Sequence, residues 1–330
     1  RIASQTKAIT SVAIMMLYEE GKFLLDEPVS KYIPEFKNPR VLVNFNEKDS
    51  SYFTEPAKSE PTIRQLLIHT SGIDYAGIGS KEGKAIFAKA GVPSGIGNHQ
   101  GLLADKMKIL AKLPLKHHPG ERYTYGLNTD VLGYLVEIWS GQSLDQFFKT
   151  RIFAPLGMND TYFYLPKEKH SRLVALYETK DGKLVQPSGY IYDGAQPNYP
   201  TLAGTYYSGG AGLSSTIEDY AKFLQLFING GIYNGKRLLS RKTIELMLTN
   251  QVQPPLTTQF GLGFGLETTV NDHQSILTIG SFSWGGAFNT QYWGDQKEKL
   301  VGLIFTNMYN SPVRDTGEKF KIATYQAIND

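Results

Sequence analysis

The chain has 330 residues, of which 41% are apolar and 20% charged, and its net charge is +3. This length is too great for one small core and suits one large domain or two closely packed ones. The composition is that of a globular protein. The small charge, with no basic run, argues against nucleic-acid binding, and the absence of cysteine excludes disulfides, thiolate metal sites and a cysteine nucleophile.

The beginning of the chain has the pattern of a buried helix. Between residues 5 and 20 apolar side chains recur every three or four positions, and Ser4 and Gly21 stand where an N-cap and a C-terminal glycine are expected. The proline-rich segment 28–60 is predicted to form loops. We expect no transmembrane segment in this chain, because no apolar run approaches the roughly 20 residues that a membrane span needs.

The middle of the chain predicts short helices joined by loops. Residues 62–73 have the pattern of a short helix that ends at Gly72. The glycine-rich residues 76–102 predict a long surface loop. Two further helices are expected at 103–112 and 128–150.

The pattern changes after residue 173 toward strands. A hairpin with an Asp-Gly turn is predicted at 174–188, and amphipathic helices are predicted at 217–229 and 240–250. After residue 259, strand-like segments alternate with short turns, which predicts four strands in succession. The short turns imply that neighbouring strands pair antiparallel. These strands are expected at 260–269, 275–281, 287–295 and 300–308. A final helix is predicted at 315–328.

This order of elements predicts an α/β fold, in which helices flank an antiparallel β-sheet and a mostly helical domain is inserted. We expect residues 1–59 and 205–330 to form the sheet domain and residues 60–204 the inserted domain. A cleft between the two would be the natural place for a ligand.

A serine and a lysine lie three residues apart at the start of the first helix. Ser4 and Lys7 would share a helix face, with Cβ atoms roughly 5–6 Å apart. A serine hydroxyl becomes a nucleophile when a base takes its proton, and a buried lysine can be that base. The positive end of the helix dipole would favour the developing oxyanion. The plainer interpretation is a serine N-cap followed by a solvated lysine.

Residues 1–36 resemble the active-site helix of the serine β-lactamase and penicillin-binding protein superfamily, and within it class C β-lactamases and the related family VIII carboxylesterases. The resemblance continues, in the order typical of that family, through 62–73, 119–137, 155–161, 208–223, 261–266 and 284–295. It implies a β-lactamase/transpeptidase-like fold and a serine hydrolase that acts through an acyl-enzyme, with Ser4 as nucleophile and Lys7 as base. No cofactor and no metal are implied.

The second motif of the family, Tyr-x-Asn, is altered here. The resemblance assigns its tyrosine to Tyr125, which in the family moves the proton between the serine and the leaving group. Leucine stands at position 127, and the asparagine follows one position late, at 128. This pattern is similar to the esterase branch. The resemblance places Leu127 and Asn128 among the substrate-binding residues.

The third motif of the family, usually Lys-Thr-Gly on a sheet strand, does not occur in the sequence. Its position is taken by Trp284-Gly285-Gly286, which resembles the Trp-Gly-Gly of family VIII esterases and implies substrate binding by these residues. The glycines would let a substrate lie against the strand backbone. The N–H of Ala287 would complete an oxyanion hole with that of Ser4.

Both altered motifs favour ester hydrolysis. Trp284 lacks the positive charge that would bind the carboxylate of a β-lactam, and Leu127 lacks the amide of the asparagine, although Arg64 or another base could supply the charge. A carboxylesterase is therefore favoured, with a small-molecule ester, amide or β-lactam as substrate. A β-lactamase or D-Ala-D-Ala carboxypeptidase remains the alternative enzyme. A non-catalytic peptidoglycan- or ligand-binding relative is the alternative from another class.

Other catalytic patterns are missing from the sequence. There is no Gly-x-Ser-x-Gly elbow and no His-Glu-x-x-His zinc motif, and the glycines of 260–265 lack phosphate-loop spacing. A nucleophile at residue 4 predicts an upstream segment that completes the sheet, because chain ends fray and a catalytic group needs rigid surroundings. A periplasmic or secreted location is expected rather than a cytoplasmic one.

Overall fold

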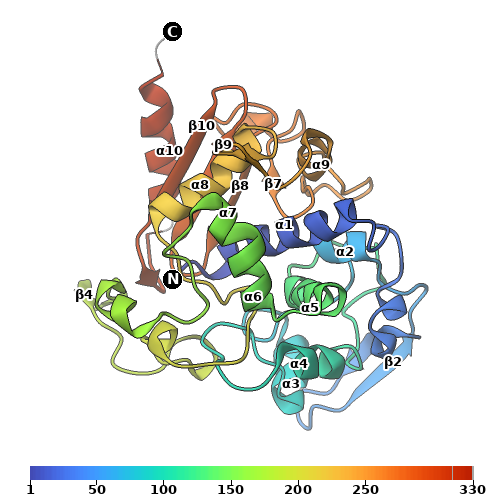
Figure 1. Cartoon of the computed structure of the whole chain (residues 1–330). Helices are drawn as coiled ribbons and strands as arrows, with labels where there is room; N and C mark the ends of the chain where they lie inside the picture. Colours follow the sequence, from blue (N-terminus) through green and yellow to red (C-terminus); the bar gives the residue numbers. More distant parts are fainter. Residues whose placement is uncertain (314, 329–330) are drawn as a thin grey trace.

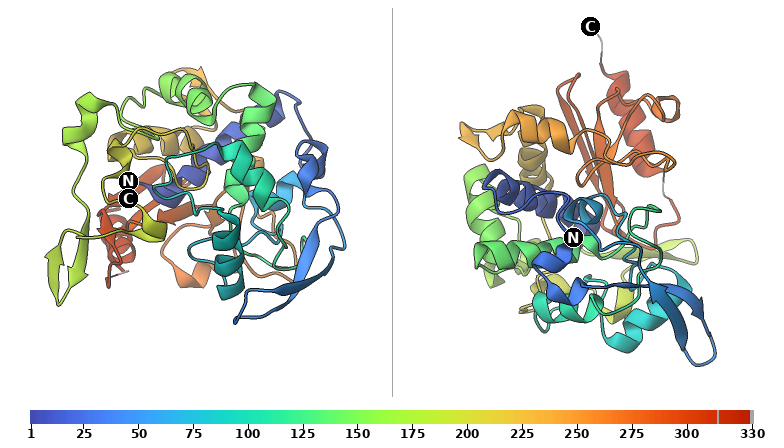
Figure 2. Two further views of the ribbon diagram at one scale, coloured as in Figure 1. Left: turned by 90° about the horizontal axis from the view of Figure 1, so that it is seen from below. Right: turned by 90° about the vertical axis from the view of Figure 1, so that its right-hand side faces the viewer.

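The computed structural model describes residues 1–313 and 315–328. Figure 1 shows a sheet with covering helices at one end of the molecule and a mainly helical group at the other, with helix α1 (Thr6–Glu19) between them. Figure 2 shows the same arrangement from two further directions. Helix α1 packs against α5 (Asn128–Ser140) of the helical group. The α/β class predicted from the sequence is therefore observed.

Helix α1 is buried on all sides over most of its length, since every residue from Thr6 to Leu17 is buried. A helix that is apolar around its whole circumference belongs in a core. It follows a short 3-10 turn, Ala3–Gln5, and its N-cap is Gln5. The prediction that Ser4 caps the helix is wrong, because Ser4 lies inside this turn. Its hydroxyl is therefore not used for capping.

The main sheet runs in the order β10-β9-β8-β7, with all neighbours antiparallel. Its strands are β7 (Gly265–Leu266), β8 (Phe282–Gly286), β9 (Thr290–Asp295) and β10 (Leu300–Phe305). On β9, Tyr292 contacts Tyr220 of α8 (Ile217–Ile228), and the next residue, Trp293, contacts Phe320 of α10 (Thr316–Gln326). Successive strand residues point to opposite faces, so α8 and α10 cover the two sides of the sheet.

One of the four predicted strands is wrong, and another, predicted at 260–269, is reduced to the two residues of β7. Residues 275–281 do not form a strand, because the chain turns there, with the N–H of Ser281 bound to Thr278 O and Gly280 at a φ of +95°. The strand begins immediately afterwards, at Phe282. The sequence pattern thus placed β8 several residues too early.

The helical group is built from mostly short helices. Its members are α2 (Ile63–Leu67), α3 (Lys81–Ala90), α4 (Leu103–Leu110), α5 (Asn128–Ser140), α6 (Leu144–Phe148) and α7 (Ala154–Leu156). Of these, α2, α3 and α6 have a side-chain N-cap. Helix α3 corrects the prediction of a long loop at 76–102. Its N-cap Ser80 accepts the N–H of Gly83, and Ile86 and Phe87 bury its inner face.

Smaller elements complete the chain. They are the hairpins β1 (Arg40–Phe45) with β2 (Tyr52–Pro56), β3 (Tyr177–Lys180) with β4 (Lys183–Val185) and β5 (Ile232–Tyr233) with β6 (Lys236–Arg237), the short strand β11 (Met308–Tyr309) and helix α9 (Arg241–Met247). The β3–β4 hairpin is confirmed, whereas β1 and β2 lie in a segment predicted to be loop. No helix among the described residues is long and apolar enough to cross a bilayer.

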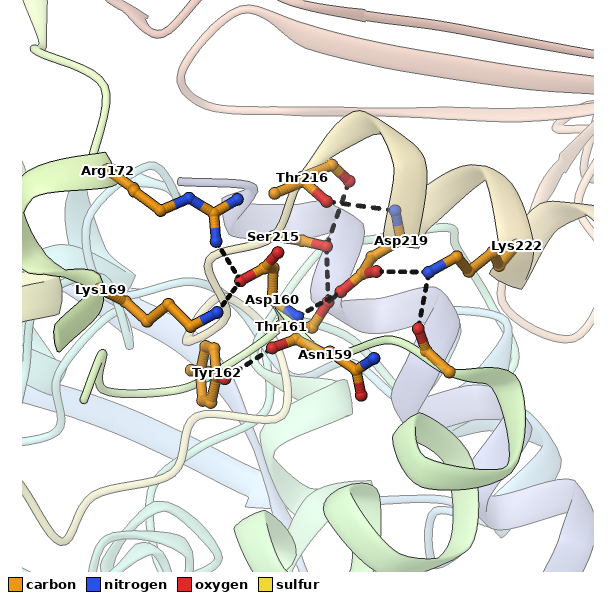
Figure 3. A network of polar contacts seen from close by, with 11 residues as sticks. Asn159, Asp160, Thr161, Tyr162, Lys169, Arg172, Ser215, Thr216, Asp219 and Lys222 are labelled. Carbon is orange, nitrogen blue, oxygen red and sulfur yellow. Dashed lines mark hydrogen bonds and ion pairs between the residues drawn. The ribbon is translucent and has the colours of Figure 1, made fainter.

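A polar network fastens the segment after α7 to the beginning of α8, as Figure 3 shows. The backbone N–H of Asp160 donates to Asp219 Oδ2 at 2.6 Å. Lys222 of α8 reaches both Asp219 Oδ1, at 3.0 Å, and the carbonyl of Gly157, at 2.6 Å. Because α8 packs on the sheet, this network joins the helical group to the sheet.

Candidate active site

Ser4 lies in the 3-10 turn before α1 and faces a cavity of about 480 Å³. The preceding residue, Ala3, has a φ of +41°, a left-handed conformation that costs an alanine on the order of 1–2 kcal/mol. The turn is held from two sides, since Ile2 N donates to Leu213 O and Leu213 N donates to Thr6 Oγ1, each at 3.1 Å. These contacts fix the direction in which Ser4 points.

Lys7 places an amine beside the serine hydroxyl. Its side chain is 3% exposed, and its Nζ lies 3.4 Å from Ser4 Oγ, 3.4 Å from the Tyr75 hydroxyl and 2.8 Å from the carbonyl oxygen of Gly210. An amine held this close to a serine hydroxyl can accept its proton. The structure thus brings together the predicted nucleophile and base.

Two tyrosine rings enclose this amine. Lys7 Nζ lies 4.6 Å from the ring centre of Tyr125, which stacks on Tyr75 at 5.5 Å between ring centres. The Tyr125 hydroxyl is buried and has no hydrogen-bond partner among the described residues. Tyr75 was missed from the sequence, because nothing in its spacing distinguishes it among 20 tyrosines. Only the folded chain shows that it contacts Lys7.

The edge of β8 forms the opposite wall of the cavity. Strand β7 pairs only with Phe282 and Ser283, so the edge from Trp284 to Gly286 is free of strand partners on that side. These residues and Ala287 line the same cavity as Ser4. A Cβ on Gly286 would stand 2.4 Å from the backbone oxygen of Ile2, which explains the glycine. The two N–H groups predicted to form an oxyanion hole thus belong to residues that face one cavity.

The sequence comparisons agree with this geometry. A family model described as Beta-lactamase matches residues 1–326. The chain belongs to the beta-lactamase family. An uncharacterised protein of Mycobacterium tuberculosis is 33% identical over 318 residues, which cover 92% of this chain and 76% of the relative. Lovastatin esterase of Penicillium rubens is 30% identical over 330 residues, covering 92% of this chain and 77% of the esterase.

The solved structure of simvastatin synthase (LovD) from Aspergillus terreus has the same fold. It superposes with a TM-score of 0.81 and 27% sequence identity, covering 100% of this chain and 84% of that chain. The β-lactamase/transpeptidase-like fold predicted from the resemblance is therefore confirmed, and the chain is a serine hydrolase of the beta-lactamase family by descent.

Two residues of the altered second motif do not reach the cavity of this beta-lactamase family member. Leu127 and Asn128 are completely buried at the start of α5 and are not among the residues that line the cavity. Asn128 Nδ2 lies 3.0 Å from His69 Nδ1, and Asn128 Oδ1 accepts from the Ser71 hydroxyl. The predicted contact of both residues with a substrate is not supported, since both side chains turn into the core.

Arg64, which the sequence offered as a source of positive charge, is absent from the cavity wall. Arg64 binds Asp26 through two nitrogen atoms, at 2.7 and 2.8 Å, and does not line the cavity. A different cation, Lys321 of α10, does line it. Its Nζ donates to both carboxylate oxygens of Glu318, at 2.9 and 3.0 Å, so an acidic partner already balances its charge.

A site for a metal ion needs several ligating side chains that lie close together. Within residues 1–313 and 315–328, no group of three or more His, Cys, Asp or Glu side chains is arranged to hold an ion.

The burial of His69 leads us to expect that the stability of the protein depends on pH. It is 2% exposed, and burial, together with the charge of Lys7, lowers its pKa well below the ordinary value. The unfolded chain takes up a proton at this site below about pH 6.5, whereas the folded chain does not, so the free energy of unfolding should fall as the pH drops through that value. We expect the urea midpoint to decrease between about pH 7.5 and pH 5.5, and His69→Asn to weaken that decrease.

Asparagine suits this test because His69 has a φ of +56°, which asparagine tolerates better than most residues. The exposed His273 offers the matched control, and His273→Asn should leave the pH dependence as it is. Burial also lowers the pKa of His117, so part of the decrease should persist in His69→Asn. If the urea midpoint falls equally with decreasing pH in the wild type and in His69→Asn, the prediction is wrong.

Proposed function

We propose that this protein is a carboxylesterase that forms an acyl-enzyme on Ser4. The observation that carries the proposal is the amine of Lys7 at 3.4 Å from Ser4 Oγ, where Ser4 lines a cavity together with Tyr125 and the free edge of β8. A nucleophile, a base and backbone donors beside one cavity are the parts that acyl transfer requires.

The first half of the reaction makes the acyl-enzyme. Ser4 Oγ attacks the carbonyl carbon of the ester while its proton passes to Lys7 Nζ. The N–H groups of Ser4 and Ala287 hold the negative oxygen of the tetrahedral intermediate. When the bond to the alcohol breaks, the hydroxyl of Tyr125 donates a proton to the leaving oxygen and recovers one from Lys7.

The second half releases the acid. Water loses a proton to the same Lys7 and Tyr125 pair and attacks the carbonyl carbon of the acyl group, and the same backbone N–H groups hold the new oxyanion. Collapse of this intermediate breaks the bond to Ser4 Oγ, which regains its proton. The chain's own groups therefore account for every proton transfer.

The cavity favours esters over β-lactams as substrates. By the sequence resemblance, Trp284 takes the position of the lysine that would bind a β-lactam carboxylate, and in the structure the charge of Lys321 is balanced by Glu318. The similarity to lovastatin esterase supports the same choice. An uncharged ester does not need to displace Glu318 from its ion pair.

We expect kcat/KM for p-nitrophenyl acetate or butyrate to exceed that for any common penicillin or cephalosporin. Parallel assays with a chromogenic ester and a chromogenic cephalosporin measure this ratio. A higher value for the β-lactam would replace the esterase proposal by a β-lactamase or D-Ala-D-Ala carboxypeptidase. Turnover of neither substrate would favour a non-catalytic binding protein.

The nucleophile itself is tested by labelling. A fluorophosphonate probe should add to the wild type, and mass spectrometry of the peptides should find the adduct on Ser4. The Ser4→Ala variant should remain unlabelled. An adduct on another serine, or none on the folded protein, would overturn the assignment of Ser4.

A further inference from the structure

A buried carboxylate lies behind the Lys7 amine. Asp130, in the first turn of α5, is 0% exposed. Its Oδ1 accepts a hydrogen bond from the Ser208 hydroxyl at 2.6 Å, and its Oδ2 is turned toward Gly210. A Cβ on Gly210 would stand 2.4 Å from Asp130 Oδ2 and 3.4 Å from Lys7 Nζ. The carboxyl and the amine are therefore within about 6 Å of each other, a range in which opposite charges affect one another's protonation.

The turn at residues 208–211 connects these two groups. Ser208 Oγ, which donates to Asp130, also accepts the backbone N–H of Ala211 at 3.0 Å. Lys7 Nζ donates to the carbonyl of Gly210 at 2.8 Å, and Thr10 Oγ1 donates to that of Gly209 at 2.6 Å. The turn is thus fixed to α5 on one side and to α1 on the other. Moving Asp130 would move the carbonyl that orients Lys7.

Such a carboxylate is costly to bury unless its charge is compensated. Burial raises the pKa of Asp130, while the Ser208 hydroxyl, the charge of Lys7 and the backbone N–H of Gly210 act in the opposite direction. The compensation is greatest when Lys7 carries a proton, since the pair then has no net charge. That is the state Lys7 reaches when it accepts the proton of Ser4.

We propose that Asp130 is a positioning residue for the reaction: through Ser208 and the 208–211 turn it orients the Lys7 amine, and its negative charge stabilises Lys7 in the protonated state that forms as Ser4 attacks. This inference rests on the proposed serine-lysine mechanism and deepens it. The proton moves from Ser4 Oγ to Lys7 Nζ, and Asp130 takes no part in the transfer.

The other groups around Lys7 offer no comparable charge. His69, Tyr75 and Tyr125 face Lys7, and Tyr206 lies close to Asp130. Burial lowers the pKa of His69 and raises that of Tyr206, so both are uncharged near neutral pH. Among these neighbours, Asp130 is the one carboxylate.

The test is the pH profile of kcat/KM for a p-nitrophenyl ester in Asp130→Asn. Asparagine keeps the shape of the side chain and removes its charge. We expect the plateau to fall by about 10-fold or more, because Lys7 accepts the proton less readily. We also expect the acidic limb of the kcat/KM profile to move to lower pH. Without the charge of Asp130 the protonated form of Lys7 is less stable, so Lys7 loses its proton at a lower pH. A role limited to packing would lower the thermal midpoint without moving the limb, and that result would overturn the proposal.

A second variant keeps the test decisive if Asp130→Asn does not fold. Ser208→Ala leaves the carboxyl in place but removes the hydrogen bond that favours its charge, and it should move the limb in the same direction by a smaller amount. The matched control is Asp145→Asn on α6, a partly buried carboxyl outside the cavity, which should leave the profile unchanged. An unmoved limb in Ser208→Ala contradicts the proposal.

Labelling separates this inference from the proposed function. If the wild type gives no fluorophosphonate adduct on Ser4, the serine hydrolase mechanism fails and Asp130 has no such role. If the wild type is labelled and Asp130→Asn is labelled at the same rate across the pH range, only the inference about Asp130 fails.

Discussion

Replacing Lys7 by alanine should lower kcat/KM for p-nitrophenyl acetate by about 10²-fold or more, the loss expected when a general base is removed. In the folded chain Lys7 Nζ lies 3.4 Å from Ser4 Oγ and is 3% exposed, so bulk water cannot readily take its place. Steady-state kinetics on the purified variant measure the loss. A small primary amine added to the assay should restore part of the activity by occupying the space that the side chain leaves.

Lys222→Ala is the matched control for this variant. Lys222 is partly buried and, like Lys7, donates to a backbone carbonyl, that of Gly157 at 2.6 Å, but in the polar network of Figure 3 its amine pairs with Asp219 and not with Ser4. It should lower the thermal midpoint and keep ester turnover. If folded Lys7→Ala retains near wild-type kcat/KM, Lys7 is not the base.

Replacing Tyr125 by phenylalanine should also cost about 10²-fold in ester turnover, and the loss should depend on the leaving group. An ethyl ester leaves as a basic alkoxide that needs a proton, whereas p-nitrophenolate leaves without one. The defect should therefore be larger for ethyl butyrate than for p-nitrophenyl butyrate. Stability should barely change, because the Tyr125 hydroxyl has no partner among the described residues.

Tyr75→Phe is the comparison that identifies the proton donor, since Tyr75 stacks on Tyr125 and its hydroxyl lies 3.4 Å from Lys7 Nζ. We expect Tyr75→Phe to affect both esters equally, through the orientation of Lys7. A leaving-group effect in Tyr75→Phe that is absent from Tyr125→Phe would transfer the role of acid to Tyr75.

The parts of the site that could be predicted are those held in short stretches of sequence. Ser4 and Lys7 are three residues apart and Trp284 to Gly286 are consecutive, so the family resemblance could locate each set within a short segment. The prediction failed where a side chain's direction depends on distant contacts. Asn128 follows the motif tyrosine closely but turns to His69 in the core.

Tyr75 and Asp130 could not be found from local patterns because their partners are far along the chain. Tyr75 meets a lysine 68 positions earlier, and Asp130 meets a serine 78 positions later. Secondary structure failed for a related reason at α3, where glycine content suggested a loop but the Ser80 cap and the burial of Phe87 stabilise a helix. Packing against the rest of the chain decided the conformation.

Strand β7 is only two residues long, and its length determines how much of the β8 edge is covered. Two residues before β7, Gly263 adopts a φ of +101° and turns the backbone, and β7 has no residue that pairs with Trp284 or Gly285. A Cβ at Gly263 would also stand 2.2 Å from the Ser11 hydroxyl. The backbone edge from Trp284 to Gly286 is therefore left free because β7 begins only at Gly265. A longer β7 would pair with this edge and cover it, so insertions or deletions before Gly265 should change the room beside β8 without changing Ser4 or Lys7.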